Sequence, residues 1–582
     1  MQLMNSTIIH SLTNFFGFSG LIVFASRLYI LQCFQHPHLL QIVNSQQQIQ
    51  FSNKDTRRLI KDREGNCIAI QELVYDCHID KNLEIDKLSA KYFGIPFYKE
   101  NMKNEKSFFF KNIPTFIFEQ VINSTLYNPI QQLKRVYPYR SLYSSVTGYV
   151  NKENQGQAGL EMSFDKRLVI NSTFLPCWVD GQGLPTGKDL YHPFIFSKKN
   201  SFFLTLNTRL QEKLYQILKK GFNTFSPNRL GSIVMDVKTG EIQAWVEFPS
   251  YDPNKYSEYS LENLTSWMAT KYYEPGSTWK PINLAIALDT GCINKDKLIL
   301  DNGKISFGEH TFKNAFVANK QQILNLTDVL RFSSNVGMVK ILQKIPLLIY
   351  YDWLLNLDLG FKNSTNSYIS YPFTTADLNS IECLFKSHLD FISHSIGQGI
   401  GLTVLKLIQI VTSLGNNGFL ITPTPVYNLS LCQKSLDKIF IGPVPYSLNP
   451  NKPRKKIFSN KTTNQICNML EKTILLGTGH NAFFQGFSLG GKTGTAQQAV
   501  KNLGYQEIAT SFFCFYPAKN PKYIIYVIID KPKSPYNFAS NTAVELGKAI
   551  VQEIIGLNND LPTKPRTFLF KNSKVKKRFF NL

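Results

Sequence analysis

The sequence lacks the cysteine spacing that marks a disulfide framework or a zinc site. An odd number of widely spaced cysteines without a C-x-x-C pair argues against both; the nine are Cys33, Cys67, Cys77, Cys177, Cys292, Cys383, Cys432, Cys467 and Cys514. We expect most of them to pack as small hydrophobic side chains. His36 and His38 have no companion carboxylates or thiols that would complete a metal site. We therefore predict neither a metal nor a cofactor.

Acidic residues are also scarce, because 41 Asp and Glu stand against 64 Lys and Arg and give a formal charge of +23. Such a balance raises nucleic-acid binding as a hypothesis, but the basic residues are dispersed and no nucleic-acid-binding module is visible. Anionic lipid headgroups or cell-wall polymers would suit the charge equally well. We predict no nucleic-acid partner.

Long apolar runs are few, and the one that could cross a bilayer is Asn14–Cys33, in which Arg27 is the single charge. A buried core helix or a cleavable signal peptide would have a similar composition. We predict an uncleaved membrane anchor, because the run is long, no small-x-small cleavage site follows it, and Arg27 could reach the interface.

The charges around this run do not agree with the simple topology rule. No Lys or Arg precedes Asn14, whereas several follow the run, namely Lys54, Arg57, Arg58, Lys61 and Arg63. The positive-inside rule would keep the following region in the cytoplasm, although long domains translocate largely regardless of such charge.

The length of 582 residues, with 43% hydrophobic and 13% aromatic residues, predicts a folded chain of two or three domains without internal repeats. The stretch that the others are organised around is Tyr273–Pro281, which reads Y-E-P-G-S-T-W-K-P. On a helix, Ser277 and Lys280 share one face, so the amine can lie within hydrogen-bond reach of the hydroxyl. This places a nucleophile beside a base, provided that the pKa of the lysine is lowered.

Two further motifs follow in order. Ser333-Ser334-Asn335 reads S-x-N, and Lys492-Thr493-Gly494-Thr495 reads K-T-G-T. A second K-T-G, at Lys238-Thr239-Gly240, precedes the nucleophile and lies between two apolar runs. We interpret this earlier copy as a hairpin turn and assign it no catalytic role.

S-x-x-K, S-x-N and K-T-G in this order resemble the three-part site of penicillin-binding proteins and serine β-lactamases. Further matching runs extend the resemblance over most of the chain, and they are G-S-I-V-M-D-V-K-T-G-E-I from Gly231, S-I-G-Q-G-I from Ser395, G-T-G from Gly477 and F-Y-P-A from Phe515. The chain is most similar to the class B penicillin-binding proteins, the peptidoglycan D,D-transpeptidases, in their division-type or FtsI-like branch.

The resemblance implies a role for each motif. Ser277 would attack the penultimate carbonyl of a stem peptide ending in D-Ala-D-Ala, with Lys280 as general base and release of D-alanine. Ser333 would relay a proton, and Asn335 would hold the Lys280 amine and the substrate amide. The substrate carboxylate would be bound by the K-T-G-T segment, that is by Lys492, Thr493, Gly494 and Thr495. The backbone N–H groups of Ser277 and Thr495 would form the oxyanion hole.

The predicted fold class is α+β: an N-terminal transmembrane helix, a mixed pedestal domain, and a β-lactamase-like transpeptidase domain with an antiparallel sheet flanked by helices. The corresponding ranges are an anchor at 1–40, a pedestal at 41–204, a transpeptidase domain at 205–560 and a basic tail at 561–582. Residues Arg57–Ala69 are similar to the family's R-G-x-I-x-D-R-x-G-x-x-L-A, except that Arg58 replaces the glycine. Asn207 stands where the family usually has aspartate.

Three alternatives stay open. Each motif residue has a structural interpretation, such as Ser333 capping the helix that starts near Val336, Asn335 as a turn residue, or Lys492 as a solvated strand lysine. A β-lactamase would share the nucleophile, although no deacylating glutamate is identified. A penicillin-binding sensor or a decayed scaffold for a glycan polymerase is the non-enzymatic alternative.

The family implies partners and a compartment. The partners would be peptidoglycan stem peptides, β-lactams as inhibitors, membrane lipid, divisome proteins and a SEDS-type glycan polymerase. The catalytic domain would be extracytoplasmic at a bacterial plasma membrane, or at a plastid envelope if the chain is plastid-encoded, since heavy use of Phe, Lys, Asn and Ile indicates an AT-rich genome.

Overall fold

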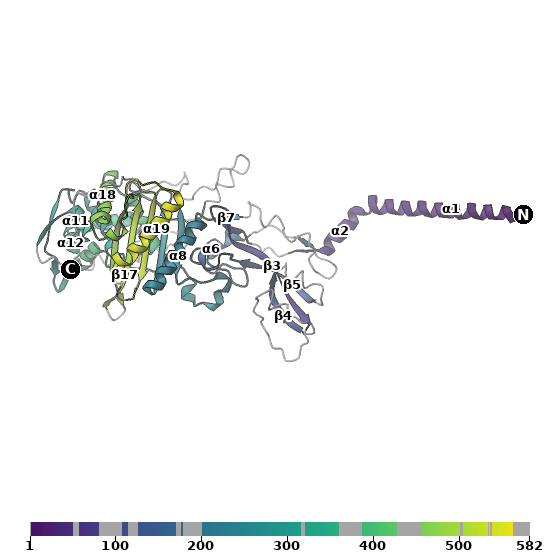
Figure 1. Cartoon of the computed structure of the whole chain (residues 1–582), viewed down its shortest axis with the longest axis horizontal. Helices are drawn as coiled ribbons and strands as arrows, with labels where there is room; N and C mark the ends of the chain where they lie inside the picture. The colour runs from purple at the N-terminus through teal and green to yellow at the C-terminus, as the bar shows by residue number, and fades with distance from the viewer. Residues whose placement is uncertain are drawn as a thin grey trace. The chain divides into compact units, whose positions relative to one another are not determined.

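A computed structural model describes most of the chain, namely residues 2–50, 57–80, 107–114, 126–169, 176–178, 201–315, 321–359, 387–427, 455–500, 504–533, 535 and 538–562. Most of the predicted basic tail at 561–582 lies outside these residues. The chain divides into two compact units (Figure 1). The first comprises 1–57, 71–134 and 169–200, and the second 58–70, 135–168 and 201–582. The four consecutive domains predicted above stay a prediction, and the second unit takes in two segments that precede residue 205.

The first unit begins with the apolar helix. Helix α1 spans Gln2–Tyr29, followed by a π-helical turn, η1 (Ile30–Phe34), and by α2 (His36–Gln47). Within the described residues, Asn14–Phe34 is long and apolar enough to cross a membrane, and it is unburied in the fold. The strands of this unit are antiparallel pairs: β1 (Gln48–Gln50) with β6 (Pro176–Trp178), and the later part of β3 (Cys67–Asp80) with β4 (Ser107–Pro114). Strand β5 (Leu126–Val136) also pairs with β3.

A five-stranded antiparallel sheet organises the second unit. Its order is β16-β17-β18-β8-β9, with bounds Gly490–Val500, Gly504–Tyr516, Tyr523–Asp530, Arg229–Asp236 and Ile242–Phe248. Successive side chains of a strand point to opposite faces, and both faces of this sheet are buried. Along β17, for example, Phe513 and Phe515 pack in one core cluster, and Phe512 and Cys514 in the other. This explains why β18 and the second half of β17 read as nearly continuous apolar runs.

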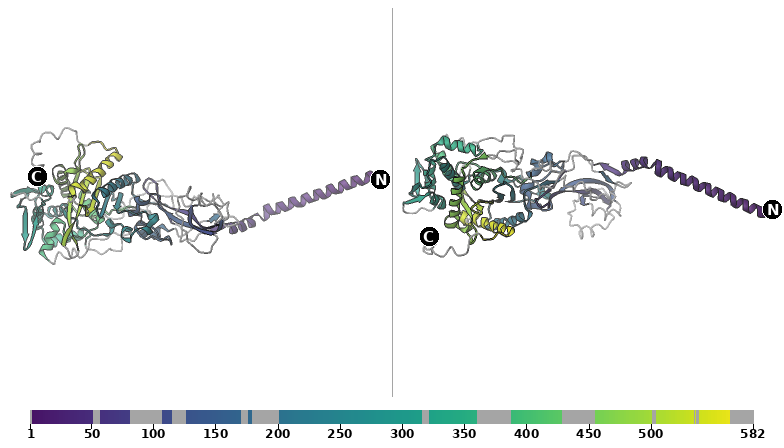
Figure 2. Two further views of the ribbon diagram at one scale, coloured as in Figure 1. Left: turned by 60° about the horizontal axis from the view of Figure 1, so that its bottom comes forward. Right: turned by 90° about the horizontal axis from the view of Figure 1, so that it is seen from above.

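Helices cover both faces of the sheet. Helices α8 (Thr208–Phe225) and α19 (Ala543–Asn558) lie side by side on one face, as both views of Figure 2 show. The helical insert covers the other face (Figure 1) and comprises α10 (Lys280–Asp289), α11 (Leu326–Arg331), α12 (Asn335–Leu342), α13 (Leu347–Asn356), α15 (His388–Ser393), α16 (Val404–Gly415) and α18 (Asn460–Leu476). The predicted α+β fold, with an antiparallel sheet flanked by helices, is confirmed.

Shorter elements complete the second unit. Strand β2 (Leu59–Lys61) pairs antiparallel with the start of β3 and parallel with β7 (Ser201–Phe203). Two small antiparallel pairs lie within the helical insert, β10 (Leu298–Asp301) with β13 (Gln322–Asn325) and β11 (Lys304–Phe307) with β12 (His310–Lys313). The other α-helices and strands described in this unit are α5 (Ser144–Thr147), α6 (Gly159–Ser163), α7 (Asp165–Leu168), α9 (Trp267–Thr270), β14 (Phe419–Leu420) and β15 (Lys455–Lys456).

The two departures from the family motif are accommodated locally. Arg58 is absent from the described residues with positive φ, so the position does not require glycine, and its Nε donates to the Arg167 carbonyl at 3.0 Å. Asn207 caps α8 by accepting from the Leu210 N–H at 3.0 Å, as an aspartate would, and its Nδ2 donates to Glu64.

Candidate active site

Ser277 lies in a single 3₁₀ turn, η6 (Gly276–Trp279), which leads directly into α10. In a 3₁₀ turn residues i and i+3 eclipse, so Lys280 follows Ser277 on the same side of the turn. Gly276 has φ +55°, and a Cβ there would lie 3.0 Å from the Cβ of Ala496 on β16. The turn therefore lies close against the strand that carries the K-T-G motif.

The Lys280 amine is fully buried and points toward the S-x-N motif. Its Nζ donates to the Ser333 carbonyl at 2.7 Å and to Asn335 Oδ1 at 2.6 Å, and lies 3.1 Å from Ser333 Oγ. The expected hydrogen bond between Lys280 and the Ser277 hydroxyl is not among the bonds that the described residues make. A neutral amine has two N–H groups, which the carbonyl and the amide oxygen can accept, and a lone pair that remains for a hydroxyl proton.

Ser333 lies between α11 and α12 with φ +56°, in the left-handed region that a non-glycine residue seldom adopts. The N-cap of α12 is Ser334, whose hydroxyl accepts from the Gly337 N–H at 2.8 Å. The interpretation of Ser333 as the cap is therefore wrong, because its neighbour performs that role. Ser333 is instead turned so that its carbonyl and its hydroxyl both meet Lys280.

Asn335 is the first residue of α12, and its amide is oriented by two contacts. Its Nδ2 donates to the Lys313 carbonyl at 2.7 Å, so its Oδ1 faces the Lys280 amine. An amide held in this way has a defined acceptor end, which a turn residue exposed to solvent would not have.

The K-T-G-T segment lies on β16, one of the two edge strands of the five-stranded sheet. Lys492 is fully buried, and its Nζ donates to Ser333 Oγ at 2.9 Å and to the Thr493 carbonyl at 3.0 Å. It is therefore not a solvated strand lysine. A Cβ on Gly494 would meet Ser511 Oγ at 2.3 Å, so only glycine fits there without a shift, and Thr495 is exposed.

The G-T-G run joins the same site. The Thr478 hydroxyl lies 2.9 Å from the Thr493 hydroxyl, and the Thr478 N–H donates to the Arg331 carbonyl at 3.1 Å. The end of α18 thus supports the K-T-G strand from the side that faces α11.

Burial lowers the pKa values of both lysines, and the charge of Lys492 lowers that of Lys280 further. Burial first, and then the charge of Lys492, hold the pKa of Lys280 well below its ordinary value, while the Asp301 carboxylate opposes this. Burial lowers the pKa of Lys492 to about 7. Near neutral pH the cluster therefore holds amines that can accept a proton, as a general base requires.

Two residues of the site, Asp301 and Asn314, belong to no recognised motif and were not predicted from the sequence. Asp301 ends β10 and accepts from the Ser334 hydroxyl at 2.5 Å, and Asn314 accepts from the Asn335 N–H at 2.8 Å. The only sequence signal is a turn-like D-N-G beginning at Asp301, which gives no reason to place it beside an S-x-N motif.

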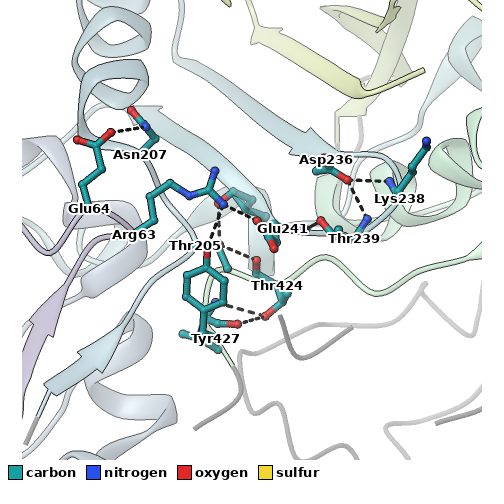
Figure 3. Close-up of polar contacts among 12 residues, drawn as sticks. Arg63, Glu64, Thr205, Asn207, Asp236, Lys238, Thr239, Glu241, Thr424 and Tyr427 are labelled. Carbon is teal, nitrogen blue, oxygen red and sulfur yellow. Dashed lines mark hydrogen bonds and ion pairs between the residues drawn. The ribbon is translucent and has the colours of Figure 1, made fainter. Parts of the chain in front are cut away.

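The earlier K-T-G lies in the turn between β8 and β9 (Figure 3). Asp236 Oδ1 accepts from the N–H groups of Lys238 and Thr239 at 2.9 and 2.8 Å, and Lys238 is exposed. The predicted hairpin is confirmed. Beside it, Arg63 Nη2 lies 2.5 Å from Glu241 and 2.9 Å from the Tyr427 hydroxyl, so the R-G-x-I-x-D-R-like segment is bound to this hairpin.

Comparisons with known proteins show the family of the chain. The family model described as penicillin binding protein transpeptidase domain matches residues 231–555. The chain is 34% identical to the peptidoglycan D,D-transpeptidase FtsI homolog of Mesostigma viride over 94% of this chain and 95% of that one. It is 27% identical to the peptidoglycan D,D-transpeptidase FtsI of Buchnera aphidicola subsp. Baizongia pistaciae (strain Bp), with 93% and 94% covered.

A likeness to solved structures supports the fold. The crystal structure of penicillin binding protein 3 of Mycobacterium tuberculosis in complex with aztreonam has a TM-score of 0.63 at 21% identity, covering 88% of this chain and 98% of that one. The family match covers more than half of the sequence, and the curated relatives match along nearly their whole length. The chain therefore belongs to the penicillin-binding protein transpeptidases, in the FtsI-like branch of class B.

Proposed function

We propose that this chain is a serine-type peptidoglycan D,D-transpeptidase that cross-links stem peptides through a Ser277 acyl-enzyme in division wall synthesis. The observation that carries the proposal is the contact of two buried lysines, Lys280 and Lys492, with the one hydroxyl of Ser333. Three motifs that are far apart in the sequence thereby converge beside the Ser277 turn. Such a cluster can accept, relay and return a proton around an acyl transfer.

Acylation starts at the Ser277 hydroxyl. The neutral Lys280 amine accepts its proton as Oγ attacks the penultimate D-alanine carbonyl, and the C–O bond forms as the carbonyl becomes an oxyanion. Backbone N–H groups of Ser277 and Thr495 stabilise this oxyanion, each by about 3 kcal/mol. The Ser277–Lys280 hydrogen bond is proposed to form in the complex with substrate, since catalytic hydrogen bonds often tighten only there.

The leaving group then takes the proton. Ser333 passes its hydroxyl proton to the nitrogen of the terminal D-alanine and recovers one from the Lys280 ammonium as the C–N bond breaks. D-Alanine leaves, and an amine from a neighbouring stem peptide attacks the ester, releases Ser277 and closes the cross-link. The same proton path, used in reverse, serves this second step.

Lys492 is proposed to bind the terminal carboxylate of the substrate together with the Thr493 and Thr495 hydroxyls. A carboxylate beside a buried amine favours the ammonium form, so substrate binding raises the pKa of Lys492 from its value of about 7. Asn335 keeps a second Nδ2 proton for the substrate amide, since only one is needed for the Lys313 carbonyl.

We propose further that Asn14–Phe34 anchors the chain in a membrane, with the catalytic domain outside the cytoplasm or facing the wall of a plastid. The apolar composition of this helix and the FtsI relatives support the anchor. A SEDS-type glycan polymerase and divisome proteins are the proposed partners. Residues 41–204 serve as the pedestal and 205–560 as the transpeptidase domain in this proposal.

Labelling with a fluorescent penicillin tests the reaction. We expect the full chain to form a covalent adduct that persists for hours, and Ser277→Ala to form none, with intact mass reporting both. Rapid loss of the label with turnover of the drug would instead make the chain a β-lactamase. A folded chain that does not label would favour a decayed scaffold.

A stable adduct alone would also fit a penicillin-binding sensor. Incubation with a stem peptide ending in D-Ala-D-Ala and an acceptor amine separates the two. Release of D-alanine together with a cross-linked product is expected of the transpeptidase. A stable penicillin adduct without D-alanine release would identify a sensor.

A further inference from the structure

One buried carboxylate lies behind the S-x-N motif without belonging to any of the three motifs. Asp301, at the end of β10, is 5% exposed. It accepts four hydrogen bonds from three residues: from the Gly303 N–H at 2.8 Å, from Asn314 Nδ2 at 3.0 and 2.9 Å, and from the Ser334 hydroxyl at 2.5 Å. All of these partners donate, as suits an ionised carboxylate.

Two of these partners, Ser334 and Asn314, link Asp301 to the S-x-N motif of the active site. The Ser334 hydroxyl, committed to Asp301 as a donor, accepts from the Gly337 N–H and so caps α12. Asn314, fixed by both oxygens of Asp301, presents its Oδ1 to the Asn335 N–H at 2.8 Å and to the Val336 N–H at 3.2 Å. The first turn of α12 is thereby held at both its cap and its backbone.

This turn carries the residues that meet Lys280. Ser333 precedes the cap in a left-handed conformation, which is strained for a residue other than glycine and needs support from its surroundings. Asn335 follows the cap and contacts the amine at 2.6 Å. A shift of α12 would move both groups together, and misplacement by about 1 Å at such a site can reduce a rate by about a hundredfold.

We propose that Asp301 is a positioning residue for the acyl-transfer reaction. Through Ser334 and Asn314 it fixes the S-x-N loop against Lys280, and its carboxylate supplies negative charge that acts on the buried Lys280 amine. This inference rests on the proposed function. Among the described residues, the charged groups that act on Lys280 are Lys492 from β16 and Asp301 from β10, with opposite signs.

The charge of Asp301 should shift the pKa of Lys280 in one direction only. A carboxylate near an amine favours the ammonium form, so removing its charge makes Lys280 lose its proton at lower pH. Asp301→Asn keeps the size of the side chain and removes the charge. We expect the acid-side midpoint of the acylation rate to move by about one pH unit toward acid, and the plateau rate to fall about tenfold because an acceptor is lost.

Two comparison variants separate positioning from charge. Ser334→Ala and Asn314→Ala each break one link to the S-x-N loop and keep the carboxylate, so the plateau rate is expected to fall several-fold without a change in midpoint. They also test positioning if Asp301→Asn does not fold. Wild-type plateau rates in both variants would overturn the positioning role.

Asp289→Asn is the matched control. Asp289 also accepts three hydrogen bonds, from the Ser459 N–H and hydroxyl and from the Thr462 hydroxyl, and so holds the start of α18. It ends α10, about 13 Å along the helix from Lys280 at 1.5 Å per residue. The variant should retain both the midpoint and the plateau of the wild type.

The experiment measures fluorescent-penicillin acylation rates across the neutral pH range with the full chain. An unmoved midpoint in folded Asp301→Asn would overturn the charge role. Labelling of the wild type that depends on Ser277 is scored separately, so a failure of this inference leaves the proposed function standing. Absence of wild-type labelling would instead remove the proposed function itself.

Discussion

The chain carries the tripeptide K-T-G twice, and the two copies have different surroundings. Lys238-Thr239-Gly240 closes the β8–β9 hairpin, with its lysine exposed. Lys492-Thr493-Gly494 lies within edge strand β16, with its lysine fully buried against Ser333. The same three side chains therefore give a turn in one place and a candidate anion site in the other. Burial and long-range contacts, not the tripeptide itself, decide which of the two results.

Replacing each lysine by alanine should separate the two copies most sharply. We expect Lys492→Ala to reduce the rate of penicillin acylation at least about a hundredfold, because a buried cation at the reacting centre is lost. Lys238→Ala removes an exposed side chain and should leave the rate within about twofold. Acylation time courses measure both, and equal effects of the two substitutions would contradict the comparison.

Alanine substitutions at the glycines of the two K-T-G copies should change different quantities, namely the acylation rate for Gly494 and the stability of the fold for Gly240. A Cβ on Gly494 would meet Ser511 Oγ at 2.3 Å and Thr278 Cγ2 at 2.8 Å, next to the nucleophile turn. We expect Gly494→Ala to reduce acylation about tenfold or more through displacement of that turn. Gly240 has φ +75°, and its Cβ would meet the Thr422 carbonyl at 2.6 Å.

Gly240→Ala should therefore destabilise the fold by about 1–3 kcal/mol and leave the acylation rate of the folded protein unchanged. Thermal melting reports the first effect and labelling below the melting range reports the second. A stable Gly240→Ala protein that acylates slowly would assign the hairpin a catalytic role after all.

The pH dependence of ligand binding should distinguish the buried Lys492 from the exposed Lys238 by a smaller effect. Burial lowers the pKa of Lys492 to about 7, so its ammonium form is lost as the pH rises through this value. Initial binding of a ligand carboxylate is expected to weaken several-fold per pH unit above it. A methyl-esterified penicillin has no carboxylate charge and should lose this dependence, whereas persistence of the dependence would contradict the carboxylate role of Lys492.

The sequence predicted much of this molecule from local patterns. The order S-x-x-K, S-x-N and K-T-G, together with the neighbouring runs, indicated the family, and two apolar runs with turn residues between them predicted the β8–β9 hairpin. Strands β17 and β18 contain the apolar runs Phe512–Tyr516 and Tyr523–Ile529, which the local sequence also marks. These features depend on residues close together in the chain, which a sequence displays directly.

Contacts between distant segments were not predictable in the same way. Ser333 was open to interpretation as a helix cap until Ser334 was found in that role, and Asp301 and Asn314 had no motif to mark them. The expected contact between Lys280 and Ser277 was replaced by contacts to Ser333 and Asn335. The hydrogen-bond partners of a buried amine depend on all the segments that pack around it.

The sequence by itself determined which residues are the candidates for the chemistry, since a candidate nucleophile, base and anion-binding group are side-chain identities in a fixed order. Tertiary structure alone decided which groups the lysine of the second K-T-G copy contacts and how its pKa is shifted. The physical reason is that a pKa depends on desolvation and on neighbouring charge, and both arise only when Lys280, Asp301 and Lys492 are brought together from separate elements.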